Sequence, residues 1–366
     1  MPNLEKPTLA WTLVWDADCV TSLTFLGKSR RLAAGNNLGQ ILLWELPEKP
    51  GGDTPKPILR LDGHTNCVSR LASTPDGEVL ISSSYDHTIR YWNPKRSPKS
   101  KEDLILNASA IADAERRKKN GAKVPPPIPA TVGVIDSTRS FDDHQEWILG
   151  MELSRDGKTL ISGDDGGQVI IRDRESGKVR HRWQVKGWVS TVALSPDEKR
   201  ACVGERLPLV FDSGRHSGLK LWDATNGTMV KDLSADFKGQ IFSSAAFSSD
   251  GKFLAVGRGG ELDGTNGIVT ILEADTGKKV RSLTPGHLSG LTDLQFHPDG
   301  KHLASCGRDT QIRIWEVSTG KMISEVGKGR GGQFKDWIHS ISWSADGNWL
   351  AAGDMAGAVQ VWHFEG

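Results

Sequence analysis

The sequence predicts an all-β fold, a seven-bladed β-propeller with four-stranded antiparallel blades. The first observation is composition: 41 glycines and 17 prolines in 366 residues, with few stretches of helical spacing, favour short strands joined by turns. The second is repetition, because seven segments share one alternating apolar pattern. The third is the Asp-Gly turn that follows five of these segments, a strong hairpin signal.

Each repeat opens with a strand of period-two alternation, which is typical of half-buried strands. The opening strands start at Cys19, Cys67, Trp147, Trp188, Ile241, Gly290 and Trp337. A second strand, a tight turn and a third strand follow. Only the third start is delayed, by about one repeat length of roughly 40 to 45 residues. Residues 97–138 fill the delay, so we expect an insertion between the third and fourth strands of blade two.

The third strand of most repeats ends in a large residue. Tryptophan takes this position at Trp44, Trp92, Trp222, Trp315 and Trp362, whereas Arg172 and Leu272 replace it in two repeats. Repeats two and six add further polar residues, forming the sets His64, Ser82, Asp86 and Trp92, and His287, Ser305, Asp309 and Trp315. With seven repeats, this pattern resembles the WD-repeat family.

The resemblance implies that each set is a structural hydrogen-bond network linking histidine, aspartate and the tryptophan indole. A buried indole N–H needs an acceptor, which gives the serine a structural role. The same trio of Ser, His and Asp recurs in two repeats at identical spacing, which disfavours a catalytic group.

The two ends of the chain are expected to meet. The last repeat ends at Trp362 without a fourth strand, and Thr8 to Trp15 form an unpaired strand near the start. The resemblance implies that the N-terminal strand completes the last blade, which would remove open sheet edges. Residues 1–366 are therefore expected to form a single domain.

The insertion of residues 97–138 is expected to be partly helical, basic and Pro-rich. Asp103 to Gly121 have near-helical spacing, which predicts a helix of about four turns. The prolines of the segment starting at Val124 follow. Between Lys95 and Lys123 nine basic residues face four acidic ones. A solvated or docked arm is the preferred interpretation, and contact with nucleic acid is the alternative.

The overall charge and the cysteines exclude several classes of protein. The 46 basic and 45 acidic residues nearly cancel, so no global field attracts nucleic acid or a membrane. No apolar run suggests a signal peptide or a membrane span. The four cysteines form no C-x-x-C pair, so no metal or other cofactor is expected and the cysteines are expected to be free thiols. We expect a cytoplasmic protein.

The central channel offers little that could support catalysis. The register of the opening strands points Glu152 and Asp293 into the channel, with Arg70 beside Glu152, and an ion pair is the expected arrangement. No nucleophile with a base and no metal cage is evident. We therefore predict that the chain is not an enzyme, and a propeller hydrolase is the remote alternative.

The expected function is a non-catalytic scaffold that binds a protein or peptide partner. WD-repeat proteins usually bind on the face where the loops between blades meet the hairpins of the second and third strands, and aromatic anchors are typical of binding hot spots. The residues predicted on this face are Trp147, Trp188, Ile241, Trp337, Lys186, Arg308 and Tyr85. Longer hairpins at residues 206–217 and 259–267 are expected beside them. Packing of each indole on its neighbouring blade is the alternative interpretation, and a nucleic-acid-associated propeller is the second function considered.

Overall fold

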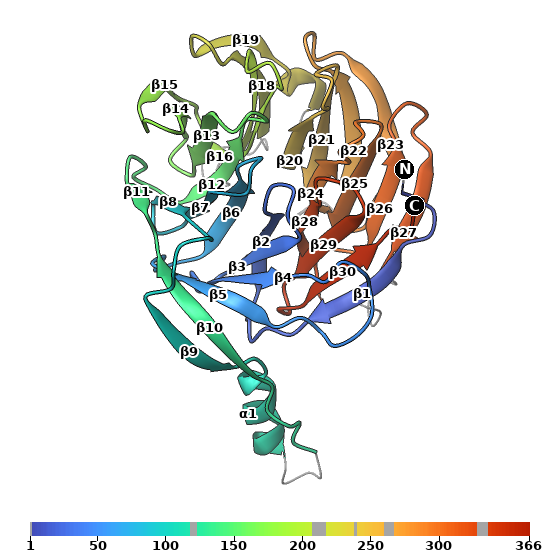
Figure 1. The fold of residues 1–366 in the computed structure, drawn as a ribbon. Coiled ribbons are helices and arrows are strands. Elements are labelled where there is room, and N and C mark those ends of the chain that lie inside the picture. Colours follow the sequence, from blue (N-terminus) through green and yellow to red (C-terminus); the bar gives the residue numbers. More distant parts are fainter. Residues whose placement is uncertain (1, 118–122, 207–216, 238–239, 260–266, 328–335) are drawn as a thin grey trace.

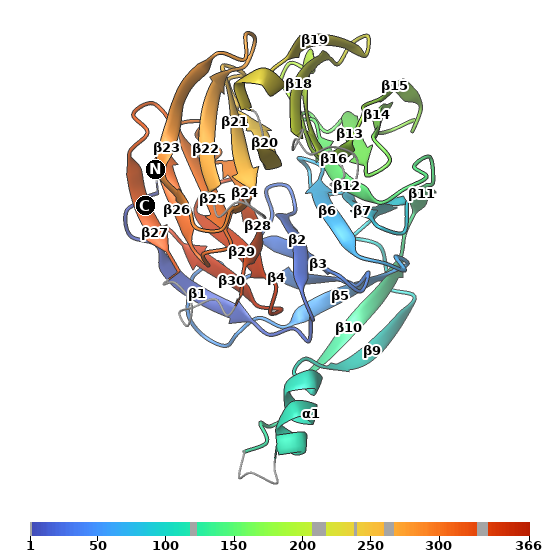
Figure 2. The same cartoon turned by 180° about the vertical axis from the view of Figure 1, so that it is seen from behind.

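The structure is a computed structural model that describes residues 2–117, 123–206, 217–237, 240–259, 267–327 and 336–366. Seven sheets stand around a central axis, as Figure 1 and the reverse view in Figure 2 show. The innermost strand of every blade faces this axis. The predicted seven-bladed β-propeller is confirmed.

The first three blades contain the following strands. Blade one consists of β2 (Val20–Phe25), β3 (Arg31–Asn36), β4 (Ile41–Glu45) and β5 (Pro57–Asp62). Blade two consists of β6 (Val68–Ser73), β7 (Leu80–Ser84), β8 (Ile89–Trp92) and β11 (Arg139–Phe141). Blade three consists of β12 (Ile148–Leu153), β13 (Thr159–Asp164), β14 (Gln168–Asp173) and β15 (Val179–Gln184).

The remaining blades follow the same order from the axis outward. Blade four consists of β16 (Trp188–Leu194), β17 (Arg200–Arg206), β18 (Ser217–Asp223) and β19 (Thr228–Asp232), followed by the short 3₁₀ helix η2 (Ser234–Phe237). Blade five consists of β20 (Ile241–Phe247), β21 (Phe253–Gly259), β22 (Gly267–Glu273) and β23 (Lys279–His287). Blade six consists of β24 (Leu291–Phe296), β25 (His302–Gly307), β26 (Ile312–Glu316) and β27 (Met322–Val326). Blade seven contains β28 (Ile338–Trp343), β29 (Trp349–Asp354) and β30 (Val359–His363).

The Asp-Gly turns join the first and second strands of their blades. In blade three, Gly157 has a positive φ of 76°, a conformation that glycine adopts without a Cβ penalty. The Ser154 hydroxyl accepts the N–H of Thr159 at 2.9 Å and donates to Asp156 at 2.8 Å. The side chains around the turn thus satisfy its backbone donors locally, as expected for a tight hairpin.

The N-terminal strand completes the last blade. Strand β1 (Thr8–Leu13) pairs with β30 in antiparallel register, from Thr8 opposite His363 to Leu13 opposite Val359. The two ends of the chain lie close together in Figure 1. The predicted closure by the N-terminal strand is confirmed.

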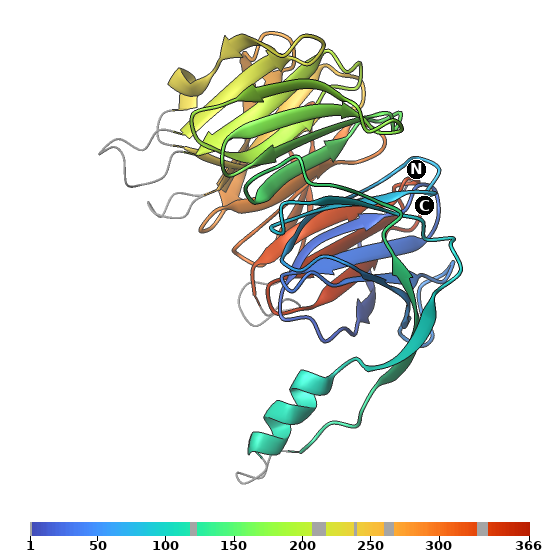
Figure 3. The ribbon, with the colours of Figure 1, turned by 90° about the vertical axis from the view of Figure 1, so that its left-hand side faces the viewer.

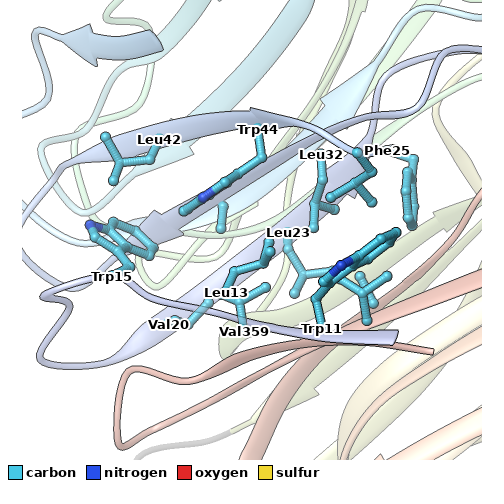
Figure 4. Close-up of a cluster of buried hydrophobic side chains, with 14 of the residues drawn as sticks. Trp11, Leu13, Trp15, Val20, Leu23, Phe25, Leu32, Leu42, Trp44 and Val359 are labelled. Carbon is cyan, nitrogen blue, oxygen red and sulfur yellow. The ribbon is translucent and has the colours of Figure 1, made fainter. Parts of the chain in front are cut away.

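The core lies between neighbouring blades, in layers of apolar side chains. Figure 4 shows one of these clusters at the closure, where Trp11 and Leu13 of β1 pack beside Leu23 and Trp44 of blade one. The Trp11 and Trp349 rings stack with centroids 5.3 Å apart. The closing strand is therefore held by buried apolar area as well as by backbone hydrogen bonds.

The insertion lies between the third and fourth strands of blade two and extends blade one. Its strands are β9 (Ser100–Ile105) and β10 (Pro129–Asp136), with helix α1 (Ala108–Arg117) between them. Strand β10 runs parallel to β5, and β9 pairs antiparallel with β10, which gives a six-stranded sheet. Figure 3 shows the insertion projecting from the ring.

The helix prediction was wrong for the first part of the insertion. Leu104 and Ile105 belong to β9, and α1 begins only at Ala108. The cause is tertiary: β9 gains its backbone partners from β10, and the ion pair between Arg60 and Glu102 at 2.7 Å joins β9 to blade one. Strand pairing thus outweighs the local helical pattern at the start of the insertion. The helix that does form, α1, buries none of its side chains.

Candidate functional site

The innermost strands share an irregularity that marks one end of the central channel. Each has a register shift near its start, between the first and third residue of the strand in five blades and between the second and fourth in β16 and β20. The extra residue of a β-bulge is left out of the regular pairing. These seven residues, which we call the collar, are Thr21, Ser69, Leu149, Ser190, Ser243, Thr292 and His339.

The collar lines one hollow of about 240 Å³ at the axis. Sequence reasoning missed the collar because strict alternation places one residue between successive apolar positions. The signal is nevertheless present, since two residues separate Val20 from Leu23 in β2 and Val68 from Leu71 in β6. Reading this doubling in every repeat would have located the bulges.

Four collar side chains, Thr21, Ser243, Thr292 and His339, connect one blade to a neighbouring blade. The Thr21 hydroxyl donates to the Val68 carbonyl at 2.5 Å, and the Ser243 hydroxyl donates to the Leu291 carbonyl at 2.7 Å. His339 Nδ1 donates to the Thr21 carbonyl at 2.9 Å, which joins blade seven to blade one. These collar groups therefore serve to hold the ring closed.

Three arginines enter the same hollow. Arg70, Arg206 and Arg308 are among its lining residues, and none of the described residues that line it is an aspartate or a glutamate. Burial lowers the pKa of His339, and the positive charges of Arg70 and Arg308 lower it further. A lowered pKa favours the neutral form of His339 at pH 7.

Exposed aromatic rings surround this hollow. Trp147 is 46% exposed and stacks on Tyr85 at 4.9 Å with nearly parallel planes. Trp188 is 36% exposed, and the Arg206 guanidinium lies 5.6 Å from its ring. We call Trp147, Trp188 and Trp337 the rim tryptophans.

The structure brings most of the sequence-predicted binding residues to this end of the channel. Tyr85, Trp188, Ile241 and Arg308 line the hollow. Trp337 is half-buried, and the Arg308 guanidinium lies 4.4 Å from its ring. Lys186 is exposed and is not part of the lining. The long hairpins expected at 206–217 and 259–267 fall mostly outside the described residues.

Deeper in the channel, polar side chains cap backbone groups of the neighbouring blade. The Ser22 hydroxyl accepts the N–H of Leu71 at 2.9 Å. Asp293 likewise accepts the N–H of Ile341 at 3.1 Å. These polar side chains thus give backbone N–H groups of the neighbouring innermost strand a hydrogen-bond partner. They therefore have a structural role.

The expected ion pair between Arg70 and Glu152 was wrong. Glu152 instead accepts the N–H of Leu194 at 3.0 Å, and burial raises the pKa of Glu152 to about 8. Because no cation of the described residues lies at hydrogen-bond distance, desolvation of this half-buried carboxyl group favours its neutral form.

The Ser-His-Asp sets form the structural networks that the WD-repeat resemblance implies. In blade two, His64 contacts Ser82 at 2.7 Å and Asp86 at 2.7 Å, and the Trp92 indole donates to Ser82 at 2.8 Å. In blade six, the corresponding distances involving His287 are 2.9 Å to both Ser305 and Asp309, and Trp315 donates to Ser305 at 2.9 Å. Ser82 and Ser305 are fully buried, which leaves no access for a substrate.

Blade three contains a variant of this set that the sequence analysis missed. His144 contacts Ser162 at 2.8 Å and Asp164 at 2.7 Å. The aspartate follows the serine after two residues instead of four, which hid the similarity. Arg172 takes the tryptophan position, is buried, and pairs with Asp143 at 2.7 Å.

One group among the described residues has the composition of a metal site. His297, Asp299 and His302 place their ligand atoms within 4.8 Å of one another. Each already has a role in the hairpin turn of blade six: the Asp299 N–H donates to His297 Nδ1 at 3.2 Å, and His302 Nδ1 contacts Asp299 at 2.7 Å. These contacts account for the cluster as part of a turn.

A family model described as "WD domain, G-beta repeat" matches residues 55–93, 135–173, 277–316 and 329–363. A WD repeat-containing protein SL1-17 of Schistosoma mansoni is 26% identical over 50% of this chain and 55% of its own length. The small ribosomal subunit protein RACK1y of Oryza sativa is 23% identical over 84% of this chain and 95% of its own.

The third relative, the target of rapamycin complex subunit wat1 of Schizosaccharomyces pombe, is 25% identical over 65% of this chain and 74% of its own length. Among the described residues, no helix has both the length and the apolar character needed to cross a membrane. The chain is thus similar to WD-repeat proteins in four matched repeats, and it has a ring of seven blades.

Proposed function

We propose that the chain is a non-catalytic scaffold that binds a protein or peptide partner on the collar end of its channel. The observation that carries this proposal is the pair of exposed tryptophans, Trp147 and Trp188, at this end of the channel. Trp147 and Trp188 expose much of their area, yet each is supported by a flat neighbour, Tyr85 or Arg206. Supported rings lose little conformational freedom when a partner covers them, which is favourable for binding.

The relatives support the same interpretation. RACK1y is named as a small ribosomal subunit protein and wat1 as a subunit of the target of rapamycin complex. The names of these two similar proteins therefore describe each of them as part of a larger assembly. We extend this to our chain as a role in assembly, and we place it in the cytoplasm, where its four free cysteines are compatible with a reducing environment.

A nucleic-acid role for the insertion is the weaker candidate. Its basic residues are partly neutralised by local ion pairs, since Lys99 contacts Asp136 at 2.6 Å and Arg117 contacts Asp113 at 3.0 Å. Nucleic-acid affinity depends on cations that are free to neutralise phosphates. Both pairs lie within the insertion and reduce the number of its cations that could neutralise phosphates.

The test compares partner capture and thermal melting for three variants. Trp147→Ala and Trp188→Ala are expected to weaken binding of the partner captured by the wild-type protein by about 30-fold, because an anchor residue contributes about 2 kcal/mol or more. Their melting temperatures should change little. Met229→Ala, which alters a 51% exposed residue in outer strand β19, is the matched control. Unchanged affinity in both tryptophan variants would refute the proposed surface.

A further inference from the structure

We propose that the proline segment of the insertion, residues 123–129, is a docking ligand for an aromatic-lined groove on another protein. The segment reads Lys-Val-Pro-Pro-Pro-Ile-Pro and ends at the first residue of β10. Grooves between aromatic side chains bind prolines spaced as Pro-x-x-Pro when these form a left-handed polyproline II helix. Pro126 and Pro129 have this spacing. The site is separate from the collar and does not depend on the proposed function.

The residue types of the proline segment favour a polyproline II helix. Each of its four proline rings holds the backbone angle φ at about −65°. Every residue from Val124 to Pro126, and Ile128 as well, precedes a proline and is therefore restricted to extended conformations. Residues 123–128 form neither a helix nor a strand in the structure, as expected for a conformation that has no internal hydrogen bonds.

The exposure of the side chains follows the period of this helix. A polyproline II helix has three residues per turn, so residues three apart lie along the same edge. Lys123, Pro126 and Pro129 are exposed, and we call them the ligand edge. Pro125 and Ile128, which share a second edge, are half-buried. The segment thus turns one edge toward its own chain and presents the ligand edge to solvent.

The backbone of the proline segment is held in place by the end of β9. The Asn107 side chain donates to the Pro126 carbonyl at 2.9 Å and accepts the N–H of Ile128 at 2.9 Å. The Leu106 N–H donates to the Ile128 carbonyl at 2.8 Å. Because these contacts order the segment before a partner arrives, binding costs little conformational entropy.

The insertion that carries the segment is itself fixed to the ring. The Ser109 N–H at the start of α1 donates to Asp16 at 3.0 Å, and Leu104 of β9 packs against the cluster at the ring closure. Beyond these contacts the insertion projects from the ring, as Figure 3 shows. A folded domain can therefore approach the proline segment from outside the blades.

Positive charge precedes the prolines and defines the partner further. Lys123 lies three residues before Pro126 on the ligand edge, so one groove can contact the cation and both prolines. Lys118 and Lys119 come earlier in the sequence, and no acidic residue occurs from Lys118 to Pro129. The matching partner is a domain of the SH3 type, with an aromatic groove bordered by carboxylates at one end.

The experiment uses the full chain and a purified SH3 domain that binds Arg-x-x-Pro-x-x-Pro peptides. Titration calorimetry at low salt is expected to show binding, and chemical shifts of the labelled SH3 domain should change in its aromatic groove. The double variant Pro126→Ala and Pro129→Ala should weaken binding about tenfold, because it removes both proline rings of the ligand edge. Lys123→Gln should weaken binding about threefold and reduce its dependence on salt.

Pro127→Ala is the matched control. It also replaces an exposed proline of the segment and loosens the chain to a similar degree, but it leaves the ligand edge intact. Its affinity should stay close to that of the wild-type chain, and the melting temperature should be the same in all variants. No binding to the full chain, or equal losses in Pro127→Ala and the double variant, would overturn the proposal. Trp188→Ala should leave binding of the SH3 domain unchanged, and a loss in this variant would assign the contact to the collar instead.

Discussion

At the residue scale, the channel shows how one kind of hydrogen bond between blades can differ in chemistry according to its surroundings. Ser22 and Asp293 accept a backbone N–H from the next blade, and Glu152 does the same. The difference is that Glu152 has only the Leu194 N–H as a donor, so desolvation raises its pKa to about 8. A structural hydrogen bond thereby becomes dependent on pH.

Glu152 therefore makes the stability of the ring fall as the pH rises. Its pKa is raised in the folded state from the usual value of 4.5 to about 8, so between these pH values the folded state binds more protons than the unfolded state. The free energy of unfolding should decrease across this window. Glu152→Gln keeps an acceptor for Leu194 and removes the titration, so it should raise the melting temperature more at pH 8 than at pH 5.

Melting curves at pH 5, 6, 7 and 8 test this expectation. Glu115→Gln is the matched control, because Glu115 is exposed in α1 and should leave the pH dependence unchanged. The same pH dependence in wild type and Glu152→Gln would show that another group is responsible.

Residue identities alone predicted some of these networks and not others. The sets around His64 and His287 have the spacing of the WD-repeat pattern, so they could be recognised in the sequence. The set around His144 could not, because its aspartate lies at a different offset and Arg172 replaces the indole. The raised pKa of Glu152 results from desolvation by surrounding residues, which no local sequence pattern records.

At the element scale, the sequence predicts those strands in which alternating apolar residues reflect burial. It does not predict strands that form only because a neighbouring strand supplies their hydrogen bonds. Strand β9 is largely exposed on both faces and exists because β10 supplies its hydrogen bonds. Strand β10, in contrast, buries Ile135 in a cluster with Leu59 and Leu61 of blade one. The insertion is thus anchored through β10, while α1 buries none of its residues.

This arrangement predicts where trypsin cuts first. Arg116 and Arg117 are exposed in the last turn of α1, whereas Lys99 and Lys101 are next to the paired backbone of β9 and β10. Proteases act on backbone that leaves its hydrogen bonds easily. The first cleavage is therefore expected after Arg116 or Arg117, with the ring still folded.

Mass spectrometry of the earliest fragments checks this order. The double variant Arg116→Gln and Arg117→Gln should slow the appearance of those fragments and leave the melting temperature unchanged. An initial cut within blade six, between Leu303 and Trp315, would contradict the assigned boundaries.

At the scale of the whole molecule, the ring is closed at two radii. Near the axis, Leu23 and Phe25 of β2 donate their N–H groups to Ser340 and Ser342 of β28, at 3.4 and 3.2 Å. At the outside, β1 pairs with β30. Closure removes an open pair of edges that would otherwise expose the core between blades one and seven. The collar hollow depends on this closure, because its lining comes from all seven innermost strands.

We expect the pairing of β1 with β30 to depend on the apolar side chains that one face of β1 buries. Trp11 is 4% exposed and stacks on Trp349, whereas Leu9 on the same strand is 40% exposed. Truncation of a buried tryptophan typically costs about 3 to 5 kcal/mol. Trp11→Ala should therefore lower the free energy of unfolding by about 3 kcal/mol or more, and Leu9→Ala, which keeps the same backbone pairing, should lower it by well under 1 kcal/mol. Urea unfolding of both variants measures the difference, and equal losses would show that backbone pairing, rather than the buried side chain, holds the ring closed.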